Sequence, residues 1–335
     1  MKQFTIPMPM RYAINTALLI LFLVVGHIIT QGGLLSRAQN AIVIQVGFFI
    51  ILAVSLNLST GYLGQLPLGH AGFMAVGAYT AGIFWRAGVL PSEISMVAGL
   101  VLAGLVAALF GLAIGIPALR LRGDYLAIIT LGFGEIIRVL INNLDFLTYG
   151  ARGMQNIPLY SSFLVVYVCV ILSCAVIHLL MKSRHGRAVL SIRENEIAAE
   201  SCGINTTYYK VMTFAVSAFL AGVAGALFAG HLGILVPQRF DFMQSINILM
   251  IVVLGGMGSM AGSVIAAAIL TSLPLMMQFM NQYRMIIYAL LLIIVMIFKP
   301  TGLLGNYDFS LSRILEKLIR RLRAGKAEKG GADHG

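Results

Sequence analysis

Residues 182–210 read KSRHGRAVLSIRENEIAAESCGINTTYYK and form the one long charged interval between apolar blocks of the chain. So many lysine, arginine and glutamate side chains cannot cross a hydrocarbon layer, so the interval must lie in water. Good helix formers run over residues 188–201, Gly203 follows where a left-handed residue would end a helix, and Asn205 or Thr206 can cap the next one. The interval therefore predicts a short helix on the membrane surface.

The apolar positions of that helix do not fall on one face, which argues against a helix lying in the lipid interface. They are Val189, Leu190, Ile192, Ile197 and Ala198. We interpret the segment as a helix offered to another protein. A solvated connecting loop is the alternative that charge pattern alone leaves open.

The composition indicates a polytopic membrane protein. Hydrophobic residues make up 59% of the 335 residues and charged residues only 10%, whereas about a quarter of the residues of soluble domains are charged. The net charge of +11 comes from basic residues beside apolar runs. That placement is typical of membrane topology and not of a nucleic-acid-binding surface. The three cysteines offer no disulfide framework.

Ten apolar runs, each near or below the length of a helical span, predict an all-α fold with about ten transmembrane helices. We expect one transmembrane domain over residues 1–305 and a basic tail over 306–335. The bias of lysine and arginine places both termini and residues 182–210 in the cytoplasm. The runs cover 13–30, 41–58, 71–86, 93–117, 125–142, 161–181, 211–229, 244–257, 261–280 and 284–299, of which 244–257 is short enough to be broken or only partly crossing.

An internal repeat supports this count. Residues 61–74, GYLGQLPLGHAGFM, align without gaps with residues 230–243, GHLGILVPQRFDFM, and share six identities. Each copy precedes the third span of its half, and five spans separate the copies. An odd number of spans puts them on opposite sides of the membrane, as in a 5+5 inverted-topology repeat.

The first copy also holds the candidate residues for a translocation path or gate. Glycines at several positions together with Pro67 cannot continue a helix, and irregular backbone at membrane depth is tolerated only against protein or a water-filled path. Gln65 and His70 fit a role in the path or in packing equally well, whereas Gly77 and Gly82 favour packing. The breaking residues are Gly61, Gly64, Pro67, Gly69 and Gly72.

A second candidate lies in the fifth run, where Glu135 and Arg138 are three residues apart on one helical face. Two charges inside a span are costly unless they are paired or wetted, so the pair is a functional hypothesis. It can also be a structural lock between helices. No phosphate-binding loop, metal-spaced Cys/His cluster or nucleophile elbow is present, so we expect no enzyme activity and no cofactor in this chain.

Four passages resemble the LivM-type permease subunits of bacterial branched-chain amino acid ABC importers, over about residues 42–305. They are NLSTGYLGQLPLGHAG (57–72), GDYLAIITLGFGEIIR (123–138) with Asn142 and Asn143, GRAVLSIRENEIAAE (186–200) and VLGGMGSMAGS (253–263). One departure is visible, because the family often has a glycine-rich loop after the paired asparagines and residues 145–154 here read DFLTYGARGM. If that loop meets the solute, the departure puts the solute's identity in doubt.

The resemblance implies a type II importer permease in the bacterial inner membrane that forms half of a path for hydrophobic amino acids. It further implies a second permease subunit, a paralogue, together with two cytoplasmic ATPase subunits and a periplasmic solute-binding protein. The paired asparagines would belong to the path. Coupling to the ATPases would fall on Gly186, Arg187, Arg193, Glu194, Asn195, Glu196, Ala198 and Gly203.

Three alternatives stay open. A close relative of this architecture could import urea or short amides. A secondary transporter would also explain inverted repeats and broken helices, but it needs a coupling-ion site, for which the lone Glu135–Arg138 pair is poor. A membrane-embedded enzyme is the third reading, and no catalytic constellation supports it.

Overall fold

The computed structural model describes residues 8–276, except for Leu34, Arg120 and Arg122, together with scattered positions between 283 and 302. Most of the tenth apolar run and the basic tail lie outside the described residues. The chain divides into two units, Met1–Leu35 with Asp308–Gly335 and Ser36–Tyr307. The described part of the first unit is dominated by one helix, α1 (Met8–Gln31).

Helices joined by loops make up the described part of the second unit, and the β-structure within that part is one isolated bridge between Met154 and Leu235. Together with α1, its helices coincide with nine of the ten predicted apolar runs. The long helices are α2 (Arg37–Asn57), α3 (His70–Ala87), α4 (Ser92–Ala118), α5 (Asp124–Asn143), α7 (Phe163–Lys182), α10 (Thr206–Leu232), α11 (Phe242–Gly255) and α12 (Met260–Met276). The shorter elements are η1 (Leu58–Tyr62), α6 (Asp145–Thr148), η2 (Gly150–Arg152), α8 (Arg184–Glu194), α9 (Glu196–Ser201) and η3 (Pro237–Phe240).

Within the described residues, four helical segments are long and apolar enough to cross a membrane: 37–62, 92–118, 163–182 and 206–232. Helix α11 has 14 residues and is therefore about 21 Å long. That is shorter than a hydrocarbon core of about 30 Å. This length agrees with the prediction that the run at 244–257 is broken or crosses only part of the membrane.

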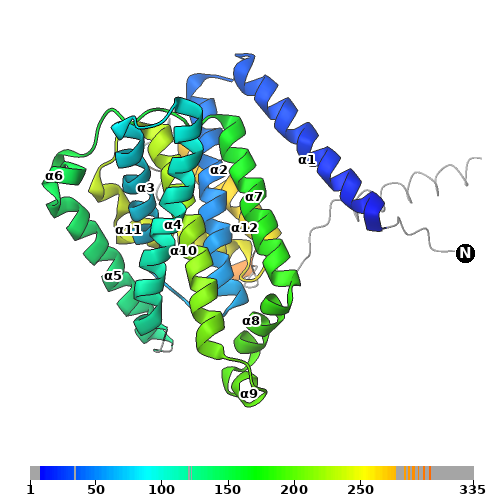
Figure 1. The fold of residues 1–335 in the computed structure, drawn as a ribbon. Coiled ribbons are helices and arrows are strands. Elements are labelled where there is room, and N and C mark those ends of the chain that lie inside the picture. Colours follow the sequence, from blue (N-terminus) through cyan, green and yellow to red (C-terminus); the bar gives the residue numbers. More distant parts are fainter. Residues whose placement is uncertain are drawn as a thin grey trace, which may run out of the picture. The chain divides into compact units, whose positions relative to one another are not determined.

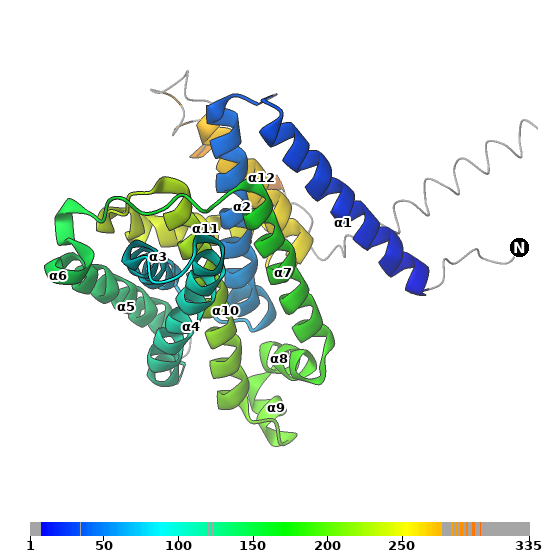
Figure 2. The ribbon, with the colours of Figure 1, turned by 45° about the horizontal axis from the view of Figure 1, so that its top comes forward.

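Helix α10 contacts α2, α3 and α4 in the bundle (Figures 1 and 2). Glycines let these backbones approach: a Cβ added to Gly77 on α3 would collide with the backbone of Gly222 on α10, and a Cβ on Gly225 would collide with the carbonyl of Met74. Small residues at such contacts are typical of membrane helices. The structure therefore agrees with the packing role predicted for Gly77.

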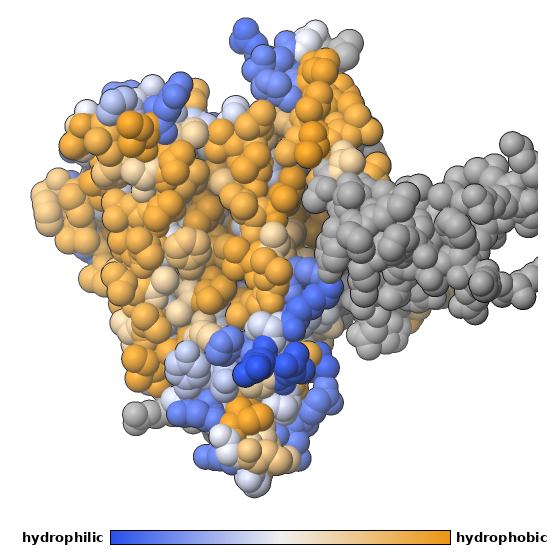
Figure 3. Space-filling model, turned by 45° about the vertical axis from the view of Figure 1, so that its right-hand side comes forward, coloured by the Kyte–Doolittle hydropathy of each residue, from blue (hydrophilic) through white to orange (hydrophobic). Residues whose placement is uncertain are grey.

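Apolar side chains cover the visible side of the bundle between its ends (Figure 3). Large apolar residues such as Leu109 and Leu179 are exposed, at 63% and 68%. Hydrophilic residues gather at the end formed by α8 and α9 (Figure 3). An exposed apolar surface of this extent indicates contact with lipid or with other proteins.

The single helix predicted over residues 188–201 is wrong, because the segment forms two helices. Asn195 between α8 and α9 is extended, with φ −159° and ψ 108°, and its side chain accepts the N–H of Ala198. An asparagine that bonds its neighbouring backbone competes with helix continuation. The predicted helix ends are confirmed, since Gly203 has φ +81° and Asn205 caps α10 through the N–H of Tyr208.

Candidate functional site

The predicted break after the second apolar run is present. After Asn57 the chain makes a π-helical turn, η1, and α3 begins only at His70. Gly64 between them has φ +77°, a conformation that favours glycine. Because π turns are frequent at functional sites, we take this broken segment, residues 58–69, as the centre of the candidate site.

Polar side chains of two other helices bind the backbone of the broken segment and of the first turn of α3. The N–H of Leu68 donates to Thr130 Oγ1 on α5 at 2.9 Å, and the N–H of Ala71 donates to Ser245 Oγ on α11 at 3.1 Å. The N–H of Gln65 returns to the carbonyl of Ser59 at 3.0 Å. Irregular backbone at membrane depth needs partners of this kind.

Gly61 lies against the loop of residues 256–259 that joins α11 to α12. A Cβ on Gly61 would collide with the backbone nitrogen of Gly258. The buried amide of Asn57 ties the same elements together: Oδ1 accepts the N–H of Gly258 at 2.8 Å, and Nδ2 donates to the Ser259 carbonyl and to Ser263 Oγ. Two of the passages that carry the family resemblance thus meet at this contact.

The remaining candidate residues of the first passage differ in their burial. His70 is 2% exposed, and its Nε2 lies 2.8 Å from Ser55 Oγ on α2. Pro67 is buried, Gln65 is half-buried and Gly64 is exposed. The contact with Ser55 favours packing for His70, which the sequence left open between packing and the path.

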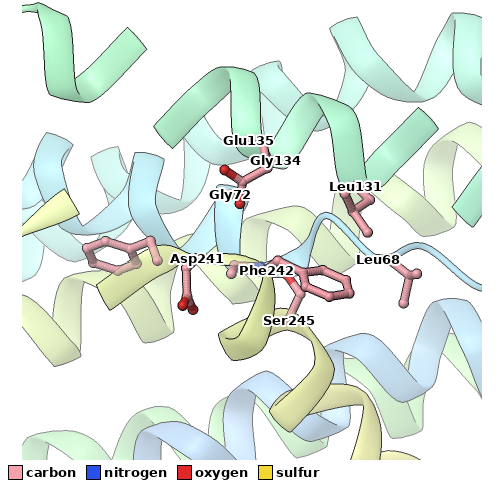
Figure 4. Close-up of a pocket in the computed structure, with 10 residues that line it drawn as sticks. Leu68, Gly72, Leu131, Gly134, Glu135, Asp241, Phe242 and Ser245 are labelled. Carbon is pink, nitrogen blue, oxygen red and sulfur yellow. Dashed lines mark hydrogen bonds between the residues drawn. The ribbon is translucent and has the colours of Figure 1, made fainter. Parts of the chain in front are cut away.

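A small pocket lies where the first turns of α3 and α11 meet the middle of α5 (Figure 4). Glu135 enters from α5, Asp241 and Ser245 from the start of α11, and Gly72 from α3. Asp241 also caps α11 by accepting the N–H of Gln244. The full lining is Leu68, Ala71, Gly72, Leu131, Gly134, Glu135, Phe240, Asp241, Phe242 and Ser245.

Glu135 and Arg138 form the predicted ion pair, with Arg138 Nε 2.7 Å from Glu135 Oε2 and side chains 30% and 32% exposed. Asn142 and Asn143 lie in the last turn of α5, where Asn143 Nδ2 donates to the carbonyl of Val139. Neither asparagine lines the pocket. The structure therefore brings Glu135, but not the paired asparagines, to the break.

Replacing Arg138 with alanine is expected to destabilise the protein by about 1–2 kcal/mol, because it leaves the half-buried Glu135 carboxylate without its charged donor. The double variant Arg138→Met with Glu135→Gln should recover most of the loss. The measurement is the midpoint of thermal unfolding in detergent. Equal destabilisation in the single and double variants would contradict a purely structural pair.

The predicted coupling residues divide into three groups. Gly186 lies in the first turn of α8, where a Cβ would collide with the backbone of Met181, and Gly203 follows α9 with φ +81°. Exposed positions are Arg187, Glu194, Asn195 and Ala198, joined by Ile197, which is 67% exposed. Arg193 and Glu196 make contacts within the chain.

Of the three charged residues Arg193, Glu194 and Glu196, the first and the last contact other segments of the chain. Arg193 Nη1 donates to the carbonyl of Gly61 at 3.1 Å, and Glu196 lies 2.7 Å from Lys210 Nζ, whose side chain is only 4% exposed. Glu194 is 71% exposed. Lys210, predicted to lie in water, is therefore a buried cation of α10.

The sequence did not predict several polar residues that form hydrogen bonds to the broken segment or to the elements beside it. A lone asparagine in an apolar run was a signal for Asn57, since polar groups within a span need partners. The serine and threonine partners carry no such signal, because these residues also bond the carbonyl one turn back in their own helix. Those partners are Thr130, Ser245, Ser259 and Ser263.

Residues 40–296 match the family model described as "Branched-chain amino acid transport system / permease component". The chain is 38% identical over 313 residues to the high-affinity branched-chain amino acid transport system permease protein LivM of Salmonella typhimurium, covering 81% of this chain and 71% of that protein. It is 37% identical to LivM of Escherichia coli with the same coverage. Identity to the permease protein LivH of Salmonella typhimurium is 25%, over 77% of this chain and 91% of LivH.

Proposed function

The chain belongs to the branched-chain amino acid transport permease family, and from this premise we propose that it forms half of the translocation path of an ATP-driven importer for branched-chain amino acids. Its relatives are permease subunits of such transport systems, and it is an inner-membrane protein. The observation that carries the proposal is the broken segment after α2, held at the junction of α5, α11 and the 256–259 loop.

The second permease subunit is a paralogue in this proposal. Two kinds of permease protein, LivM and LivH, resemble the chain at 38% and 25% identity. A pair built from two related but different chains accounts for both likenesses. A solute-binding protein on the outer side and two ATPase subunits on the cytoplasmic side complete the importer.

The path runs past the pocket at Glu135. Helices α3 and α11 both begin there, and broken helices near the middle of a span commonly form the solute sites of transporters. Glu135 is the twelfth residue of the 20-residue α5, so the pocket faces the middle of that helix. These features support a solute site midway along the path.

An inverted 5+5 repeat of ten spans fits this arrangement. Both sequence copies, 61–74 and 230–243, lead from the end of a long helix through irregular backbone into a shorter helix. The first copy contacts α8 through Gly61. The second contacts the α6–α7 connection through Gly233, at the other end of the bundle (Figure 1). The lysine and arginine bias places the α8 end and both termini in the cytoplasm.

The docking surface for the ATPase is formed by the exposed residues of α8 and α9 that surround Ile197. Ile197 is an isoleucine 67% exposed within the most charged interval of the chain. An exposed apolar anchor with a polar rim is typical of a protein contact. Arg187, Glu194, Asn195 and Ala198 provide the rim.

Replacing Ile197 with aspartate is expected to abolish ATP-dependent leucine uptake in reconstituted vesicles, because a buried carboxylate would destabilise the docked ATPase. The variant should still insert and associate with the partner permease. Copurification of the ATPase subunits should fall at least tenfold. Ile197→Val, which keeps an apolar side chain, is the matched control and should retain uptake.

Two results would contradict the proposal. Full leucine uptake by Ile197→Asp vesicles that contain no ATP would favour a secondary transporter. Uptake of urea but not leucine by the unaltered complex would favour the alternative solute class.

A further inference from the structure

The side chain of Arg193, at the end of α8, contacts the broken segment that follows α2. Its Nη1 donates to the carbonyl of Gly61 at 3.1 Å, and its Nη2 lies 2.6 Å from Glu194 Oε1. Gly61 is in the last turn of the π-helical segment. Carbonyls at a helix end lack partners within the helix and carry partial negative charge, so a guanidinium is a strong cap for them.

The same side chain lies beside two further glycines. A Cβ on Gly64 would come within 3.0 Å of Arg193 Cγ, and a Cβ on Gly258 within 3.4 Å of Arg193 Nη1. Both glycines have positive φ, +77° and +84°. The Arg193 side chain therefore adjoins the break after α2 and the loop before α12 at once.

Apolar contacts fix α8 to the same place. Val189 and Ile192 of α8 and Ala199 of α9 form a buried cluster with Leu63, which directly follows the π-helical turn. A displacement of α8 thus carries residue 63 with it through packing, and residue 61 through Arg193. Packed interiors transmit such shifts because they deform little.

We propose that Arg193 is a positioning residue that transmits movement of α8 to the broken segment after α2 and to the 256–259 loop. Because the broken segment belongs to the first half of the chain and the 256–259 loop to the second half, both halves would respond to movement of this one guanidinium. The proposal rests on the proposed function, in which α8 and α9 receive the ATPase. In this proposal Ile197 contacts the ATPase, and Arg193 contacts the membrane-spanning part of the permease.

The test compares Arg193→Met, Arg193→Lys and the control Arg184→Met in the complete transporter, reconstituted with its partner permease, ATPase subunits and binding protein. Arg184 is an exposed arginine of the same helix. We measure leucine uptake, ATP hydrolysis and the stimulation of hydrolysis by leucine-loaded binding protein. The ratio of leucine imported to ATP hydrolysed reports coupling. A variant that only lowers the amount of folded protein would lower uptake and hydrolysis together and leave this ratio unchanged.

Arg193→Met is expected to lower this ratio about tenfold, the size of effect typical of losing a charged donor, with the ATPase still bound. Arg193→Lys should retain part of the ratio because its ammonium can reach one acceptor. Arg184→Met should match the unaltered complex. An unchanged ratio in Arg193→Met, or loss of ATPase copurification, would overturn the positioning role, whereas absence of ATP-dependent uptake in the unaltered complex would overturn the proposed function itself.

Discussion

Replacing Gly77 with alanine is expected to destabilise the bundle by about 2–3 kcal/mol, because the added methyl group has no room between α3 and α10. A Cβ at Gly77 meets the backbone of Gly222, and backbone cannot rotate aside as a side chain can. Helix α10 cannot retreat either. A Cβ on Gly222 would itself meet Ala103 and Ala107 of α4, so α10 is held on both sides.

The matched control is Gly132→Ala on α5, where an added Cβ finds no heavy atom within 4 Å. Alanine is favoured over glycine in a helix by about 1 kcal/mol, so this variant should be as stable as the original or more so. The midpoint of thermal unfolding in detergent, together with the yield of inserted protein, measures both. Equal unfolding midpoints for the two variants would show that the α3–α10 contact can accommodate a methyl group.

The helices themselves were predictable because each apolar run must satisfy its backbone within the span. Which helices contact each other was not predictable. The small residues of α3 and α10 indicated close packing, but they did not indicate that Gly77 contacts Gly222. The break after α2 was predictable from Gly61, Gly64 and Pro67, since these residue types cannot continue a helix. What the break contacts is decided by tertiary structure, which placed Ser245 and Thr130 beside it.

The charged interval shows where local reasoning was insufficient. Helix propensity predicted one helix, yet Asn195 caps a second helix and so ends the first. Charge alone predicted water around Arg193, Glu196 and Lys210, but Lys210 is only 4% exposed and pairs with Glu196, and the exposed Arg193 also donates to the Gly61 carbonyl. A charged residue near a helix end can therefore be structural, and only its neighbours in space show which role it has.

Replacing Lys210 with methionine is expected to destabilise the protein by about 1–3 kcal/mol, because it removes the buried ammonium that pairs with the partly buried Glu196 carboxylate. Lys210 Nζ lies 2.7 Å from Glu196 Oε1, with side chains 4% and 21% exposed. Lys210 also lies near the start of α10, where the helix dipole disfavours a cation. Its burial there therefore depends on Glu196.

Lys182→Met is the control, since Lys182 is exposed at the end of α7 and its loss should cost at most about 1 kcal/mol. The double variant Lys210→Met with Glu196→Leu should regain most of the unfolding midpoint, because two apolar groups can replace a buried pair. If Lys210→Met unfolds at the same temperature as Lys182→Met, the pair contributes nothing to the attachment of α9. In another outcome, the double variant regains stability while its vesicles lose leucine uptake. That result would show that the pair holds α9 in the position that the ATPase binds, so that its role lies in coupling as well as in folding.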